Sequence, residues 1–196
     1  MARVISPDIF TAAEELVAEE LKRLGYPIIQ EFGYHSFFPQ EAREAIASVN
    51  TPTALYIRTM ADRVAINSSS VLQVEVKELR GAEYANIAIE ALPALIHRNL
   101  WWAFGIDCLY TFALNNGIKA SWVQDLPIFK IIIPSRFKNS QEINWPKLFK
   151  QFFPDVPHEE KPTKGSGDPF GLISPHDLST MPMLEQILRI SNDTEN

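Results

Sequence analysis

The chain opens with a pattern of apolar residues that is typical of an amphipathic helix. Apolar side chains recur every three or four residues from Ile9 to Leu24, which is the spacing of one face of an α-helix. Ser6 and Pro7 before this run favour a helix N-terminus, and Gly25 after it favours a C-terminal cap. The sequence therefore predicts a first helix that ends at Gly25.

Strand-like patterns follow this helix. Residues 26–32, 54–59 and 63–67 are short apolar runs that favour strands. Residues 40–48 favour a short helix, and the serines at 68–70 favour a turn. The segment after the first helix is therefore expected to be rich in β-structure.

The most regular pattern lies at residues 71–77, where two kinds of side chain alternate strictly. Successive side chains on a strand point to opposite faces of the sheet, so this alternation predicts a strand with two unlike faces. The apolar face consists of Leu72, Val74 and Val76. The other face consists of Val71, Gln73, Glu75 and Lys77. We expect the first face to lie in the core and the second to carry chemistry.

The middle of the chain continues as helix and strands. Residues 82–104 predict a long helix, with a kink or break at Pro93. Three further strands are predicted, the first two joined by an Asn-Asn-Gly turn, at residues 107–114, 118–124 and 129–133. Together these elements predict an α/β protein with a central mixed β-sheet flanked by helices.

The character of the chain changes after residue 135. Prolines and glycines concentrate in residues 154–175, which we expect to form a linker. A short helix is predicted before it, over residues 145–153, and a last helix after it, over residues 178–190. We therefore predict an α/β core at 1–135 and a C-terminal extension at 136–196.

Composition narrows the class of protein. The chain has 196 residues, a net charge of −6 and a pI near 5.3, which counts against a broad basic face that coats nucleic acid. Its single cysteine, Cys108, excludes a disulfide framework within one chain and fits the reducing cytoplasm. Charged residues interrupt the most apolar stretch, 85–114, so we expect no membrane span.

Candidate chemistry lies between residues 62 and 77. Asp62 opens one predicted strand, and Glu75 and Lys77 share the polar face of the next. If these strands pair as a hairpin, Asp62 comes close to Glu75. Converging carboxylates repel each other unless a cation lies between them, and their oxygens suit Mg²⁺ or Mn²⁺. A neighbouring lysine can orient or deprotonate a water. Glu-x-Lys is also a common surface ion pair on strands, so the tripeptide alone is not specific.

The run Asp62…Glu75-Val76-Lys77, preceded by an amphipathic helix, resembles the motif of the PD-(D/E)XK nuclease superfamily. That superfamily includes many restriction endonucleases and the archaeal Holliday-junction resolvases. The resemblance covers roughly residues 8–133. It implies a restriction-endonuclease-like core with element order α-β-β-β-α-β, and a metal bound by Asp62, Glu75 and the carbonyl of Val76.

The sequence departs from the motif in two places. Ala61 stands where the motif has proline, at a position that is not a metal ligand. Residues 33–53 are inserted relative to the compact resolvases. In resolvase-type members a glutamate of the first helix joins the metal site. Spacing back from Gly25 favours Glu14, whereas Glu20 is the acid on the apolar stripe of the helix, and both stay open.

Other polar residues are candidates for substrate contact. Gln73 shares the face of Glu75 and could touch substrate or water. Tyr84 and Asn86, expected at the start of the helix after the motif strand, could contact phosphate. Two further groups could bind nucleic acid, although core packing and a solvated rim explain them as well: His97, Arg98, Trp101 and Trp102, and then Lys119, Lys130, Arg136 and Lys138.

These residues favour a magnesium- or manganese-dependent nuclease, a hydrolase that acts on DNA. One alternative is a non-catalytic restriction-endonuclease-like module that acts through a protein or nucleic-acid partner. Another is a phosphoester hydrolase of nucleotides or RNA. Nucleases that cut both strands often dimerise, so a homodimer through residues 178–190 is also open.

Overall fold

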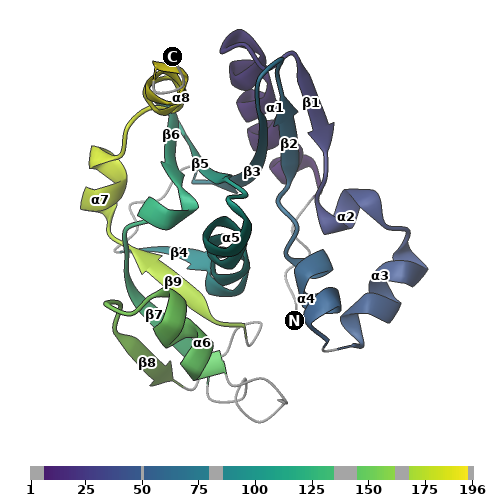
Figure 1. Cartoon of the computed structure of the whole chain (residues 1–196), viewed down its shortest axis with the longest axis vertical. Coiled ribbons are helices and arrows are strands. Elements are labelled where there is room, and N and C mark those ends of the chain that lie inside the picture. The colour runs from purple at the N-terminus through teal and green to yellow at the C-terminus, as the bar shows by residue number, and fades with distance from the viewer. Residues whose placement is uncertain (1–6, 50, 80–85, 135–144, 162–167, 194–196) are drawn as a thin grey trace.

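The computed structural model describes residues 7–49, 51–79, 86–134, 145–161 and 168–193 (Figure 1). The helices are α1 Pro7–Arg23, α2 Tyr34–Phe37, α3 Gln40–Ala47, α4 Pro52–Arg58, α5 Ala91–Phe104, α6 Trp145–Phe152, α7 Pro175–Thr180 and α8 Leu184–Asp193, with a 3₁₀ turn η1 at Val123–Asp125. The strands are β1 Ile28–Glu31, β2 Arg63–Ile66, β3 Val71–Glu78, β4 Ile87–Glu90, β5 Cys108–Leu114, β6 Gly117–Trp122, β7 Ile128–Pro134, β8 His158–Lys161 and β9 Phe170–Ile173. In these residues no helix is long and apolar enough to cross a membrane.

The first sheet has five strands in the order β1-β2-β3-β5-β6. Strands β3 and β5 are parallel and the other pairs are antiparallel, so the sheet is mixed. A parallel pair needs a crossover connection, and the chain between β3 and β5 supplies it through α5. The mixed α/β class and the order α-β-β-β-α-β are therefore confirmed, running from α1 through β1, β2 and β3 to α5 and β5.

The two faces of β3 lead to two different cores, as the alternation predicts. Leu72, Val74 and Val76 are buried against α1 and α8, in one cluster with Val17 and Leu188. The opposite face of the sheet packs on α5, through Cys108, Tyr110 and Phe112 of β5. Glu75 and Lys77 lie on that second face, because β3 pairs with β5 in the register Glu75–Tyr110 and Lys77–Phe112.

The second sheet has four strands in the order β4-β9-β7-β8. Strands β8 and β9 lie within residues 154–175, so the prediction that this region is only a linker is wrong. Apolar burial outweighs its proline and glycine content: Ile173 is buried, and Gly171 packs so closely that an added Cβ would meet Ile128 at 3.0 Å. Because β7 pairs with both β8 and β9, the second sheet joins residues from both sides of position 135. The domain boundary there stays a prediction.

The segment 54–59 is a helix and not the predicted strand. The side chain of Thr51 caps α4 by accepting a hydrogen bond from the backbone N–H of Ala54, at 3.3 Å. Pro52 occupies the first turn. Both are helix-start signals, and here they outweigh the apolar run that follows.

The prediction of one long helix over 82–104 is also wrong for the first part of that range. Strand β4 ends at Glu90, and α5 begins only at Ala91. Pro93 therefore lies in the first helical turn, where its missing N–H costs no helical hydrogen bond. Residues 80–85 lie outside the described part of the chain. The last predicted helix, over 178–190, is divided into α7 and α8.

Candidate functional site

The β2–β3 hairpin brings Asp62 beside Glu75. Arg63 pairs with Val74 in this antiparallel hairpin, so Asp62, the residue before Arg63, lies opposite Glu75. Asp62 is fixed there from two sides. Its Oδ2 accepts a hydrogen bond from the backbone N–H of Val76 at 2.7 Å, and its carbonyl accepts from the N–H groups of Phe32 and Gly33 at 3.0 and 3.1 Å. The expected closeness of the two acids is therefore present.

The Asp62 carboxyl is in an unfavourable place for a negative charge. Burial and the adjacent Glu75 carboxylate raise its pKa to about 8. The Lys77 ammonium and the hydrogen bond from Val76 offset this only in part. Glu75 itself is buried, with 5% of its surface exposed. A carboxyl in such surroundings keeps its proton to a higher pH unless a cation lies nearby, which is the setting in which paired carboxylates bind a metal ion.

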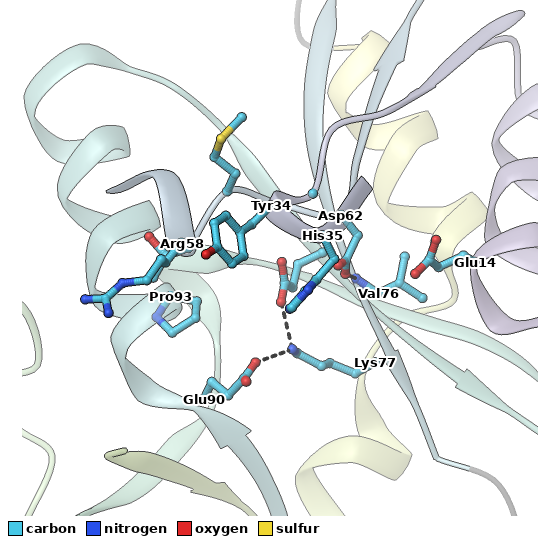
Figure 2. A pocket seen from close by; sticks show the side chains of 13 residues that line it. Glu14, Tyr34, His35, Arg58, Asp62, Val76, Lys77, Glu90 and Pro93 are labelled. Carbon is cyan, nitrogen blue, oxygen red and sulfur yellow. Dashed lines mark hydrogen bonds and ion pairs between the residues drawn. The ribbon is translucent and has the colours of Figure 1, made fainter. Parts of the chain in front are cut away.

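Lys77 lies between two glutamates. Its Nζ is 2.7 Å from Oε1 of Glu75 and 2.9 Å from Oε2 of Glu90 (Figure 2). Burial lowers the pKa of Lys77, but the two carboxylates outweigh burial and the net pKa lies well above its usual range. Lys77 therefore stays protonated at any physiological pH. It can orient a water or stabilise negative charge, but it is not a base.

Glu90 is the residue of the site that sequence reasoning missed. It ends β4 of the second sheet and is the N-cap of α5, so its carboxylate arrives from a different sheet than Glu75. Its pKa is lowered, chiefly by Lys77. Because the sequence predicts one continuous helix over 82–104, it does not identify Glu90 as the end of a strand. The alternation of buried and exposed residues in Ile87–Glu90 is the signal that could have found the strand.

The two glutamates of α1 are placed differently. Glu14 lines the same pocket as Asp62 and Glu75, and its carboxylate pairs with Arg63. Glu20 instead pairs with Arg23 on the surface, at 2.6 Å, away from that pocket. Of the two acids left open by the sequence, Glu14 therefore lies at the pocket and Glu20 lies outside it, and a role for Glu14 stays a prediction.

The pocket has a volume of about 570 Å³. Its lining residues come from β3 and from helices on both sides of that strand (Figure 2). Its floor is β3 and the residue before β2. Its walls come from α1, from the insertion that holds α2 and α4, and from the start of α5. The lining residues are Glu14, Gly33, Tyr34, His35, Arg58, Thr59, Met60, Asp62, Glu75, Val76, Lys77, Glu90 and Pro93.

The two predicted substrate contacts that the structure describes do not line this pocket. Gln73 and Asn86 do not line it, and Asn86 is an exposed residue directly before β4 rather than the start of a helix. Tyr84 lies outside the described residues. The expected basic set is engaged elsewhere: Lys119 donates to the carbonyl of Met181 at 2.7 Å, and Lys130 pairs with Glu159 at 3.2 Å. Arg136 and Lys138 also lie outside the described residues.

Helix α5 places its polar and aromatic residues in three environments. His97 is buried, and its Nδ1 lies 2.9 Å from the hydroxyl of Tyr110, directly behind the site. The Arg98 guanidinium lies over the ring of Phe153, 4.7 Å from its centre. Trp102 is 69% exposed, so the expectation that both tryptophans pack into the core is wrong for this one.

The donor set fits a hard divalent cation. Within the described part of the chain, no group of three or more histidine, cysteine or acidic side chains is arranged to hold a metal. Asp62 and Glu75 are two, and hard cations such as Mg²⁺ commonly take one or two carboxylates and complete their shell with water and phosphate oxygens. Oδ1 of Asp62 has no hydrogen-bond partner among the described residues. Burial and Glu75 raise the pKa of Asp62, so a cation bound between the two acids would favour the ionised form of Asp62.

Comparison with known proteins gives little beyond this geometry. No protein-family model and no curated protein matches the sequence. A solved structure that resembles the chain is that of Archaeoglobus fulgidus Hjc, a Holliday junction resolvase from an archaeal hyperthermophile, determined at 1.6 Å resolution. The identity is 12% and the TM-score 0.48, over 91% of this chain and 94% of that chain. Because this similarity is low, the assignment of the site rests on its own residues.

Proposed function

We propose that this protein is a divalent-metal-dependent nuclease that hydrolyses phosphodiester bonds in DNA. The observation that carries the proposal is the meeting of Asp62 and Glu75 below the surface, with the Lys77 ammonium on the same face. Structural ion pairs rarely set two acids against each other in a buried place, because one of the two charges then lacks a partner.

Asp62 and Glu75 would hold a Mg²⁺ or Mn²⁺ ion, with the Val76 carbonyl as a further expected ligand. Such an ion supplies positive charge that polarises the phosphate and lowers the pKa of a bound water. Val76 contributes a second time through its N–H, which fixes the orientation of the Asp62 carboxylate. Glu14 stands at the edge of the pocket, where its pairing with Arg63 sets its position.

Lys77 acts as a cation in this account. Its ammonium orients the attacking water and stabilises the negative charge that gathers on the phosphoryl oxygens. The water oxygen forms a bond to phosphorus, and the bond from phosphorus to one sugar oxygen breaks. One proton of the water goes to the released hydroxyl and the other stays with the water oxygen or passes to solvent. Glu90 keeps the Lys77 ammonium in place from the side opposite Glu75.

A second candidate function is a non-catalytic module that binds a partner. The ion pairs of Lys77 favour it, because Glu75, Lys77 and Glu90 already satisfy one another without a metal. Cleavage separates the two functions.

The test is a cleavage assay on labelled DNA in Mg²⁺, Mn²⁺ or EDTA with three proteins. Wild type should cut only with metal. Lys77→Ala should lose about 10²- to 10³-fold in rate, the usual effect of removing one transition-state charge partner. Lys130→Ala, which removes an equally strand-borne lysine from a surface pair, should cut like wild type. Equal rates for the two variants, with both folded by circular dichroism, would contradict the proposal.

A further inference from the structure

The inserted segment between β1 and β2 forms a wall over the acidic floor. Figure 1 shows α2, α3 and α4 together on the side of the molecule that carries β1 and β2. The wall is tied to the floor, because the N–H groups of Phe32 and Gly33 both donate to the carbonyl of Asp62. An added Cβ at Gly33 would lie 3.4 Å from the Asp62 Cα, so the chain crosses the site in close contact.

The wall also approaches the site from the side of α5. His35 of α2 is close enough to Glu90 to contribute to the lowered pKa of that carboxyl. Glu90 in turn contacts Lys77 at 2.9 Å. Arg58 of α4 and Pro93 of α5 complete this side of the lining (Figure 2). The acidic site is therefore bounded on one side by α1 and on the other by α2, α4 and α5.

The size of the pocket limits what can enter it. A volume of about 570 Å³ falls within the range of small-ligand sites, roughly 300–1,000 Å³. This leaves room for a phosphate with the nucleotide attached to it. A paired duplex, by contrast, is too large to enter a pocket of this volume.

The surface charge of the chain does not favour the binding of a duplex either. Duplex-binding proteins neutralise a run of phosphates with a set of lysines and arginines. Here the cations that form ion pairs with acids of the same chain include Arg23, Arg63, Lys77, Lys130, Lys161 and Arg189. The net charge of the chain is −6. A substrate held in the pocket by local contacts fits this charge distribution better than a duplex laid along a basic face.

The wall carries an aromatic ring at the pocket. Tyr34 lines it, and its hydroxyl donates to the carbonyl of Arg43, which fixes the ring. The ring packs against His35, with ring centres 5.1 Å apart, and against Phe38. A base can stack on such a ring only when it is not stacked between its neighbours in a duplex.

We propose that this site accepts single-stranded DNA, at an end or in an unpaired segment, with one base against Tyr34 and the adjoining phosphate over Asp62 and Glu75. The wall, formed at the pocket by α2 and the end of α4, excludes intact duplex. This inference rests on the proposed nuclease function and specifies its substrate class.

The first experiment compares cleavage of three DNA substrates by wild type in Mg²⁺ and Mn²⁺: a linear single strand, a single-stranded circle, and a relaxed, covalently closed duplex circle. At least one single-stranded substrate should be cut about 10- to 100-fold faster than the closed duplex, given the usual contribution of base stacking. Cutting of the closed duplex at the same rate would overturn the inference and leave the nuclease function intact. No cutting of any of the three substrates would overturn the proposed function and the inference with it.

The second experiment measures binding without cleavage. Fluorescence anisotropy with the Lys77→Ala protein and Ca²⁺ compares a labelled single strand with the same strand in a hairpin duplex, with and without the added change Tyr34→Leu. The single strand should bind more tightly, and Tyr34→Leu should weaken its binding about 10-fold. The control Tyr56→Leu changes an exposed tyrosine of α4 outside the pocket and should leave binding unchanged. Equal affinity for strand and hairpin, or equal effects of the two leucine variants, would overturn the inference.

Discussion

Two clusters of lysine and glutamate are built on the strands of this protein, and they differ in surroundings and in the balance of charge: one lysine lies between two glutamates in the first, and one glutamate lies between two lysines in the second. In the first cluster, called buried after its Glu75, Lys77 contacts the buried Glu75 and the exposed Glu90. In the exposed cluster, Glu159 contacts Lys130 and Lys161. Both are built on strands, and their contact distances are similar, 2.7–2.9 Å in the first and 2.9–3.2 Å in the second.

Burial and a second acid separate these clusters. The exposed pairs leave a carboxylate whose pKa is lowered by its hydrogen bonds to Lys161 and Lys130, as in any surface ion pair. In the buried cluster the neighbouring Asp62 has its pKa raised to about 8 by burial and by Glu75. The same residue types therefore form a solvated rim in one place and a candidate metal site in the other.

The largest difference should come from removing one glutamate from each cluster. Glu75→Gln removes a proposed metal ligand and should lower the cleavage rate by about 10²- to 10³-fold. Glu159→Gln should leave it unchanged. The measurement is the initial rate of DNA cleavage at saturating Mg²⁺. Equal cleavage rates in the two variants would contradict the proposed functional difference between the two clusters.

Asp62→Asn tests the same distinction through stability. An aspartate with a raised pKa keeps its proton longer in the folded chain than in the unfolded chain. The free energy of unfolding therefore falls as the pH rises from about 4 to about 8, and this contribution falls no further above pH 8. Asp62→Asn removes this loss and should stabilise the protein by on the order of 2 kcal/mol at pH 8.5, but not at pH 4. Urea unfolding at the two pH values measures the effect, and a gain that does not depend on pH would argue against the raised pKa.

Glu90→Gln should have a smaller effect on activity. Glu90 holds Lys77 and does not face the proposed metal, so its loss should lower the cleavage rate about 10-fold, as for other residues that position a site from outside. The affinity for Mn²⁺ should fall less than in Glu75→Gln, because Glu90 contacts Lys77 and is not a proposed ligand. A loss of Mn²⁺ binding as large as that in Glu75→Gln would instead make Glu90 a ligand.

Tyr110→Phe should have the smallest effect, on stability. The variant removes the hydroxyl 2.9 Å from the buried Nδ1 of His97 and should cost about 1 kcal/mol of unfolding free energy, the usual value for one buried hydrogen bond. Urea unfolding at pH 7.5 measures it. A cost near zero would mean that this pair does not support the floor of the site.

The sequence predicted the part of the site that depends on one hairpin. Strict alternation over residues 71–77 determines which side chains share a face, and a turn of three serines brings the preceding strand back. The position of Asp62 beside Glu75 follows from these two local features. The first helix and the glycine that follows it are likewise local, which is why α1 could be predicted.

Contacts between distant segments could not be predicted in the same way. Glu90 reaches Lys77 only because β4 pairs with β9, which lies about eighty residues later in a region rich in proline and glycine. The wall also includes α4, whose apolar sequence resembles a strand unless the Thr51-Pro52 cap is weighed more heavily. Tertiary pairing, which local patterns do not encode, decides the first of these two places, whereas a local cap signal decides the second.

The most direct test of the metal site is calorimetric titration of Mn²⁺ into wild type and Asp62→Asn at pH 7, in two buffers with different ionisation enthalpies. Because Asp62 holds a proton at this pH, Mn²⁺ binding to wild type should release it, and the measured heat should differ between the buffers. Asp62→Asn should show neither the buffer-dependent heat nor binding of comparable affinity. The same heat and affinity in both proteins would contradict the assignment of Asp62 and Glu75 as a metal site.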